Sequence, residues 1–254
     1  MGENLKIEVH AAIAVLTLNR PAKRNAMSDA LLAEIDGFFR MPPSGVRVAV
    51  ITGAGGHYCA GLDLSEHVAR DAEGTMHHSR GWHDVMDRLQ GSGLPVVSAL
   101  SGAVIGGGLE LATSTHVRIA EPDCIFQLPE GRRGIFVGGG ATVRVGRILG
   151  ADRMTEMMLT GRKYGTDDAV RMGLAHYAVA TGEALPKALE IAEQIAGNAP
   201  LSNYMMIQGI ARIHDMGRSD GLFVESLCAA LAQTSPDAVE GLAAFLEKRS
   251  PSFR

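Results

Sequence analysis

The stretch Ile105-Gly106-Gly107-Gly108-Leu109-Glu110-Leu111-Ala112 governs how this chain of 254 residues is interpreted. Three consecutive glycines leave a loop without side chains, so its backbone N–H groups can touch a ligand. A helix-forming run follows directly. The glycines are therefore expected at a helix N-terminus, where free amides and the helix dipole favour negative charge. Glu110 falls in the first turn of that helix. The stretch predicts an oxyanion site with a carboxylate beside it, whereas a glycine triplet alone also fits a flexible turn.

Three further segments support such a site. His57-Tyr58-Cys59-Ala60-Gly61-Leu62-Asp63-Leu64 follows an apolar run, and Gln127-Leu128-Pro129-Glu130-Gly131 supplies a second glutamate. Asn19-Arg20-Pro21 precedes Lys23-Arg24-Asn25-Ala26 near the N-terminus. In this order and spacing the segments resemble the crotonase (enoyl-CoA hydratase/isomerase) superfamily. The resemblance continues to the tail Phe245-Leu246-Glu247-Lys248-Arg249.

The resemblance implies a specific chemistry: water adds across the 2,3 double bond of an enoyl-CoA thioester. The N–H groups of Leu62 and Gly107 would form the oxyanion hole for the thioester enolate. Glu110 would orient and deprotonate the water, and Glu130 would deliver a proton to the α-carbon. Coenzyme A is part of the substrate, so no separate cofactor is implied. The residues implied to contact the substrate or its coenzyme are Lys23, Arg24, Ala60, Gly61, Asp63, Leu64, Gly106 and Lys248, the last sometimes from a neighbouring subunit.

Other readings of the same residues stay open. Two glutamates favour a hydratase over an isomerase, which in this superfamily generally uses one carboxylate, often at the position of Glu130. Dehydration, thioester hydrolysis and carbon–carbon cleavage share the same oxyanion site, because function is set by the acid–base groups added to a fold. An acyl-CoA-binding paralogue without turnover is the alternative from a different class.

Two competing motifs are weaker. Gly53-Ala54-Gly55-Gly56 follows a strand, but the last glycine of a dinucleotide fingerprint would fall on Tyr58. His77, His78 and His83 lack acidic or cysteine partners at ligand spacing, so no metal site is predicted.

The sequence departs from the family pattern after Glu130. Val137 stands where the family often has proline, so we expect a different loop near the acyl chain. Arg132 and Arg133 follow Glu130 closely, and a guanidinium beside a carboxylate lowers its pKa and disfavours its acid form. If either arginine turns inward, the acyl group is expected to carry a carboxylate or another polar end. The alternative places both arginines in solvent.

Composition indicates a soluble globular chain with 46% hydrophobic and 20% charged residues. A net charge of −4 gives no electrostatic reason to bind nucleic acid. Three cysteines in a chain this long suggest reduced thiols, and neither a membrane-spanning run nor a secretory signal is visible. We therefore expect a cytoplasmic protein with no nucleic-acid or membrane partner.

Periodicity predicts alternating strands and helices. Strands are expected near 6–9, 13–18, 46–52, 95–100, 117–120 and 124–128, and helices near 28–40, 77–90, 108–114 and 139–149. The character becomes helical from about residue 184, and the final helix is expected at 236–248. We predict an α/β core over residues 1–195 and a helical region over 196–254 used for subunit contacts. The resemblance implies a crotonase-like spiral of ββα units and a homotrimer or homohexamer.

Overall fold

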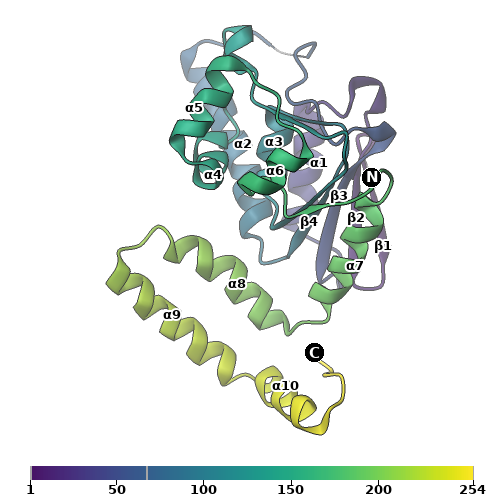
Figure 1. Ribbon diagram of the computed structural model, residues 1–254, viewed down its shortest axis with the longest axis vertical. Coiled ribbons are helices and arrows are strands. Elements are labelled where there is room, and N and C mark those ends of the chain that lie inside the picture. Colours follow the sequence, from purple (N-terminus) through teal and green to yellow (C-terminus); the bar gives the residue numbers. More distant parts are fainter. Residues whose placement is uncertain (1, 67, 254) are drawn as a thin grey trace.

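The computed structural model describes residues 2–66 and 68–253 (Figure 1). Its main sheet has six strands in the order β1-β2-β3-β4-β6-β8, and a separate pair joins β5 and β7. Only the β1–β2 pairing in the main sheet is antiparallel. The strands are β1 (Leu5–His10), β2 (Ile13–Leu18), β3 (Val48–Gly53), β4 (Val96–Leu100), β5 (Ala103–Ile105), β6 (Val117–Ala120), β7 (Ile125–Gln127) and β8 (Tyr177–Ala178). The predicted α/β class is confirmed. The very short strands β5 and β8 were not predicted.

Helices cover this sheet and extend beyond it. Those of the α/β part are α1 (Asp29–Arg40), α2 (Ala72–Gly91), α3 (Gly107–Thr113), α4 (Ala141–Leu149), α5 (Ala151–Thr160), α6 (Thr166–Met172) and α7 (Ala184–Ala196). Short 3-10 turns are η1 (Pro21–Lys23), η2 (Ala54–Gly56) and η3 (Glu130–Arg133). The C-terminal helices are α8 (Pro200–Ile213), α9 (Arg218–Gln233) and α10 (Pro236–Glu247).

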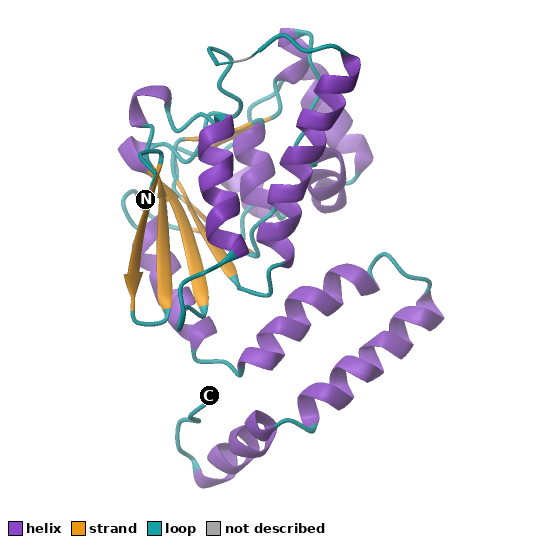
Figure 2. Cartoon of the chain, turned by 180° about the vertical axis from the view of Figure 1, so that it is seen from behind, coloured by secondary structure: helices purple, strands orange, loops and turns teal. Residues whose placement is uncertain are grey.

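Both faces of the central strands β2, β3, β4 and β6 are largely buried, which explains their nearly continuous apolar sequences. Along β2, Ile13 and Val15 pack in a core with Ala188 and Ile191 of α7. The alternate residue Leu16 belongs to the larger core on the opposite face. Side chains alternate across a strand, so one short segment supplies both cores. Figure 2 shows α7 behind the sheet, α1 and α2 on the opposite side, and the C-terminal helices below.

The helix boundaries follow local capping. Ser28 accepts a hydrogen bond from the Leu31 N–H at 3.2 Å, so α1 begins where the sequence predicted. Helix α2 begins earlier than predicted, because Asp71 caps it through the Gly74 N–H at 2.7 Å. The first turns of α2 are mostly exposed and carry no apolar stripe, so periodicity could not reveal them.

Helix α8 contacts α2 of the α/β part, and α9 and α10 lie farther out, with α9 packed along α8 (Figures 1 and 2). Several of their large apolar side chains are exposed, including Phe223, Leu227 and Phe245. Within the described residues, no helix combines the length and apolar character needed to cross a bilayer.

Candidate active site

The β5–β7 pair brings the two predicted glutamates together. Its strands are parallel and Ile105 is in register with Gln127, so the chain leaves both strands at the same edge. One exit leads through Gly106 into α3, which carries Glu110. The other leads into η3, which begins at Glu130. A hydrogen bond of 2.9 Å from the Gly106 N–H to the Gln127 carbonyl fixes the two exits side by side.

The two predicted oxyanion donors have unpaired N–H groups. Leu62 forms a parallel bridge with Met27. The Gly61 carbonyl accepts a hydrogen bond from the Met27 N–H, and the Asp63 N–H donates to the Met27 carbonyl. The Leu62 N–H therefore points away from Met27. Gly107 is the first residue of α3, where N–H groups have no partner within the helix. No described residue accepts a hydrogen bond from either group.

These two amides lie next to each other. A β-carbon placed on Gly61 would come within 3.3 Å of the Gly107 nitrogen, and one on Gly107 within 3.6 Å of the Leu62 nitrogen. Gly61 has φ of +92°, a conformation that disfavours any side chain. The glycines at 61 and 107 therefore allow two main-chain donors to approach one point.

Glu110 is held by one of its two oxygens. Its Oε1 accepts hydrogen bonds from the N–H groups of Gly139 at 2.8 Å and Ala141 at 3.1 Å. Its Oε2 accepts none from the described residues. Burial raises the pKa of this carboxyl, and the two amides and the charge of Arg144 oppose that rise. The held oxygen fixes the side chain, and the other remains available to a ligand or water.

Glu130 is buried without a hydrogen-bond donor for its Oε2 among the described residues. Burial raises its pKa to about 7, with a contribution from the charge of Glu110, and the charge of Arg133 opposes the rise. A β-carbon on Gly106 would lie 2.8 Å from Glu130 Oε1, so this carboxyl sits against the loop before α3. Burial raises the pKa of both carboxyls; they differ in that two loop amides donate to Glu110, whereas Glu130 Oε2 has no donor among the described residues.

Trp82 of α2 closes one side of this arrangement and was not among the predicted catalytic or substrate-binding residues. It is 6% exposed, and its ring lies against both Gly107 and Gly139. Its Nε1 is buried without a hydrogen-bond partner among the described residues. A tryptophan on an amphipathic helix has the same sequence signature as a core residue, so no pattern distinguished it.

Residues 23–24 and 60–64, which are expected to contact coenzyme A, lie along one edge. The Ala60 N–H donates to the Arg24 carbonyl at 3.0 Å, which joins the basic segment to the segment 60–64. Lys23 and Arg24 are exposed, and Leu64 is half exposed. The Asp63 carboxylate is instead occupied by Ser65 and Arg20, which hold its pKa near 2.

Lys248 is not brought to this edge by the chain's own fold. It caps α10, which packs on α9, away from the α/β part.

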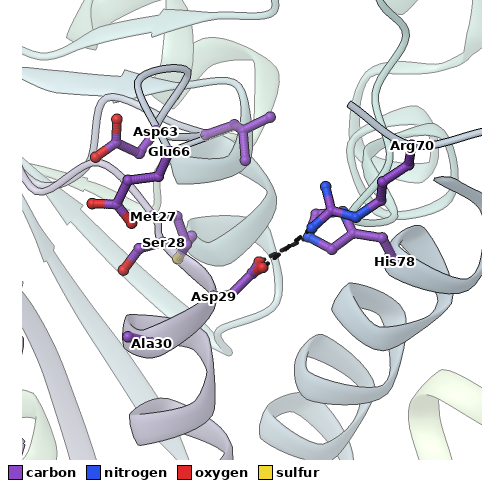
Figure 3. Close-up of a pocket in the computed structure, with 9 residues that line it drawn as sticks. Met27, Ser28, Asp29, Ala30, Asp63, Glu66, Arg70 and His78 are labelled. Atoms are coloured by element: carbon purple, nitrogen blue, oxygen red, sulfur yellow. Dashed lines mark hydrogen bonds and ion pairs between the residues drawn. The ribbon is translucent and has the colours of Figure 1, made fainter. Parts of the chain in front are cut away.

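A small recess is lined by Leu62 and by residues of α1 and α2 (Figure 3). Its volume is about 80 Å³, which has room for only a few heavy atoms. Asp29 and His78 meet across it at 2.8 Å, and Arg70 lies 3.4 Å from the same carboxylate. The recess is thus polar at its rim and adjoins one oxyanion donor.

The remaining predicted side chains face outward. Arg132 is exposed and donates to the Thr160 carbonyl at 2.6 Å, so it does not turn into the site. Arg133 is also exposed. His78 pairs with Asp29, and His77 lies 3.7 Å from Glu73 on the surface of α2.

The chain is similar to known proteins over nearly its whole length. The sequence profile of the family described as "Enoyl-CoA hydratase/isomerase" matches residues 8–254. Enoyl-CoA hydratase EchA19 of Mycobacterium tuberculosis is 31% identical over 100% of this chain and 97% of its own length. The 2,3-dehydroadipyl-CoA hydratase of Escherichia coli is 32% identical over 95% of each chain.

Solved structures give the same fold. An enoyl-CoA hydratase from Bacillus anthracis superposes with a TM-score of 0.93 at 31% identity, over 98% of each chain. A Rhodopseudomonas palustris protein of the same family superposes with a TM-score of 0.94 at 44% identity, over 96% of this chain and 95% of the other. The crotonase-like architecture predicted from the motifs is therefore confirmed. This chain belongs to the enoyl-CoA hydratase/isomerase family, that is, to the crotonase superfamily.

Proposed function

We propose that the protein is an enoyl-CoA hydratase, which adds water reversibly across the 2,3 double bond of an enoyl-CoA thioester. The observation that carries the proposal is the meeting of two unpaired main-chain donors, at Leu62 and Gly107, with two buried carboxyls of unlike environment. A thioester oxygen placed between the two amides would gain negative charge in the transition state. Each such donor is typically worth about 3–4 kcal/mol in acyl chemistry.

The carboxyls divide the proton transfers between them. Water attacks the β-carbon while Glu110 Oε2 takes its proton, and the electron pair of the double bond moves to the thioester oxygen. The enolate then collapses as Glu130 gives its proton to the α-carbon. The assignment is supported by the amides that hold Glu110 Oε1 and leave its Oε2 free for water, and by the absence of a described donor to Glu130 Oε2.

The coenzyme is proposed to lie along the edge formed by residues 60–64 and the exposed Lys23 and Arg24. Lys248 would act from a neighbouring subunit, since its own helix stands away from the site. The exposed apolar side chains of α9 and α10 support a homotrimer or homohexamer as the functional form. No cofactor beyond coenzyme A itself is proposed.

Hydration of crotonyl-CoA, followed by loss of the thioenoyl absorbance, tests the activity directly. Glu110→Gln and Glu130→Gln are each expected to lower kcat by about 10²–10⁴-fold. An isomerase would instead convert a 3-enoyl-CoA and depend chiefly on Glu130. Binding of acyl-CoA without turnover would contradict the proposal. A panel that adds an acidic substrate, such as the 2,3-dehydroadipyl-CoA named for the E. coli relative, would define the acyl class.

A further inference from the structure

The segment Gly138–Ala141, called here the carboxylate loop, makes hydrogen bonds on two sides. On its inner side the N–H groups of Gly139 and Ala141 both donate to Glu110 Oε1. On its outer side its carbonyls accept from side chains of neighbouring helices. A shift of those helices would therefore move the loop amides that hold Glu110, the proposed catalytic base.

Ser79 of α2 is the first outer anchor. Its hydroxyl donates to the Gly138 carbonyl at 2.7 Å. That carbonyl and the Gly139 N–H belong to the same peptide unit, which is planar. Fixing the carbonyl on one side therefore aims the N–H at Glu110 on the other.

Arg144 of α4 is the second anchor. It is 8% exposed, and its Nη1 donates to the Gly139 carbonyl at 3.2 Å. Its own position is set from α2, because its Nε donates to Gln90 at 2.9 Å and its Nη2 pairs with Asp87. One buried guanidinium thus joins two residues of α2 to the next peptide unit of the carboxylate loop.

We propose that Ser79 and Arg144 are positioning residues for Glu110, which act by fixing the peptide planes of the carboxylate loop. The inference rests on the proposed function, since it assigns the two residues to the water-activating step. Neither side chain makes a hydrogen bond to Glu110 itself. Ser79 acts through the loop amides alone, whereas Arg144 also acts on Glu110 through its charge.

The loop needs these anchors because its own backbone is permissive. Gly140 has φ of +103°, and a β-carbon there would lie 2.1 Å from Arg144 Nη1. A β-carbon on Gly139 would lie 2.5 Å from Glu110 Oε2. Both positions therefore need glycine for close approach, and glycine has the largest conformational freedom to lose. External hydrogen bonds offset that freedom and keep the two amides aimed at one oxygen.

Several charged or titratable groups surround Glu110 and bear on its protonation. Glu130 of η3 and Arg144 of α4 interact with it electrostatically, as does the thiol of Cys59. His83 and Asp87 of α2 lie beyond the carboxylate loop, His83 near Gly140 and Asp87 on Arg144. The variants below leave Glu130, Cys59, His83 and Asp87 in place, so a changed titration of Glu110 reports the loop and the charge at position 144.

The test compares Ser79→Ala, Arg144→Met and Arg144→Lys with wild type. Arg147→Met is the matched control, because Arg147 lies on the same helix but pairs with Asp215 at the surface. With crotonyl-CoA, Ser79→Ala and Arg144→Met are expected to lower kcat about ten- to a hundred-fold with KM changed less than about two-fold, because a hydrogen bond to a charged group and near-attack alignment are lost. Arg144→Lys should recover part of kcat, and Arg147→Met should match wild type.

An activity-independent readout accompanies the kinetics. The Glu110 carboxyl is titrated by NMR on glutamate labelled with carbon-13, with its signal assigned by Glu110→Gln. Ser79→Ala retains every charge and is the cleaner variant; its Glu110 titration should move to higher pH. A lower melting temperature with unchanged kcat and unchanged Glu110 titration would overturn the inference. If wild type turns over no enoyl-CoA, the proposed function fails and the titration alone still decides the positioning role.

Discussion

The indole of Trp82 rests directly on Gly107: a β-carbon at position 107 would lie 2.8 Å from Cζ3 and 3.1 Å from Cη2 of the ring. The same ring reaches Gly139, where a β-carbon would lie 3.0 Å from Cε3. Trp82 thus spans the proposed oxyanion donor and the loop that holds Glu110. A change in the packing of this ring is therefore expected to displace the proposed oxyanion donor at Gly107 and the loop amide at Gly139.

Gly107→Ala is therefore expected to lower kcat for crotonyl-CoA by about 10²-fold, because the methyl group displaces either the ring or the Gly107 amide. Trp82→Leu in the same chain should restore part of that loss by removing the clash. Gly37→Ala provides the control, since Gly37 lies in α1 with open space where a β-carbon would stand. A double variant no better than Gly107→Ala would show that the ring does not transmit the change.

The rate of hydration is expected to fall as pH rises through about 7. Glu130 must be neutral to give its proton to the α-carbon, and burial raises its pKa to about 7. The dehydration direction needs the same single proton on the pair, carried by Glu110 for the leaving hydroxide, so its rate should fall over the same range. Because Glu110 and Glu130 interact, the measured value belongs to the pair. Profiles of kcat against pH in both directions test this role. A hydration profile without a fall in rate between about pH 6 and 8 would contradict it.

The raised pKa of Glu130 also predicts how stability depends on pH. Its ordinary value of 4.5 applies in the unfolded chain, and the folded value is about 7. Between these values the folded state binds the extra proton, so the free energy of unfolding falls as pH rises, by on the order of 3 kcal/mol in total. Above about pH 7 this contribution is flat.

Glu130→Gln should remove most of that fall, because the amide does not titrate. Urea unfolding of wild type and variant from pH 4.5 to 8 measures the difference. Glu225→Gln, a change at an exposed position of α9, should keep the wild-type slope. If the free energy of unfolding falls equally with pH in Glu130→Gln and in wild type, a group other than Glu130 titrates over this range.

The sequence predicted those parts of the site that depend on local signals. Glycine at 61 and 107 marks close backbone approach, and the family resemblance implied that Glu110 and Glu130 meet. Trp82, Ser79 and Arg144 were missed because their roles depend on contacts between α2 and the carboxylate loop, which are distant in the sequence. The predicted helix at 139–149 begins at Ala141 instead, since Gly140 adopts a left-handed conformation that opens the loop.

The same limit applies to the recess and the basic residues. Nothing in the sequence placed Asp29 opposite His78, because α1 and α2 are joined through β3 and a long loop. The inward orientation considered for Arg132 does not occur, because the carbonyl of Thr160 at the end of α5 takes its guanidinium. Long side chains find such partners only once the tertiary fold is known.

The C-terminal helices provide the last prediction, which concerns assembly. Phe223, Leu227 and Leu231 follow one another at four-residue spacing on α9, and each is about half exposed or more. A contiguous apolar stripe of this kind is unfavourable in water and is typical of a subunit interface. We therefore expect light scattering of the wild-type protein to give three or six times the mass of the chain. Phe223→Asp combined with Leu227→Asp should lower that mass, whereas Glu225→Gln on the same helix should not. If Lys248 of a neighbouring subunit contacts the coenzyme, the dissociated variant should also show a raised KM for crotonyl-CoA. A double variant of unchanged mass, or a wild type already monomeric, would contradict the interface.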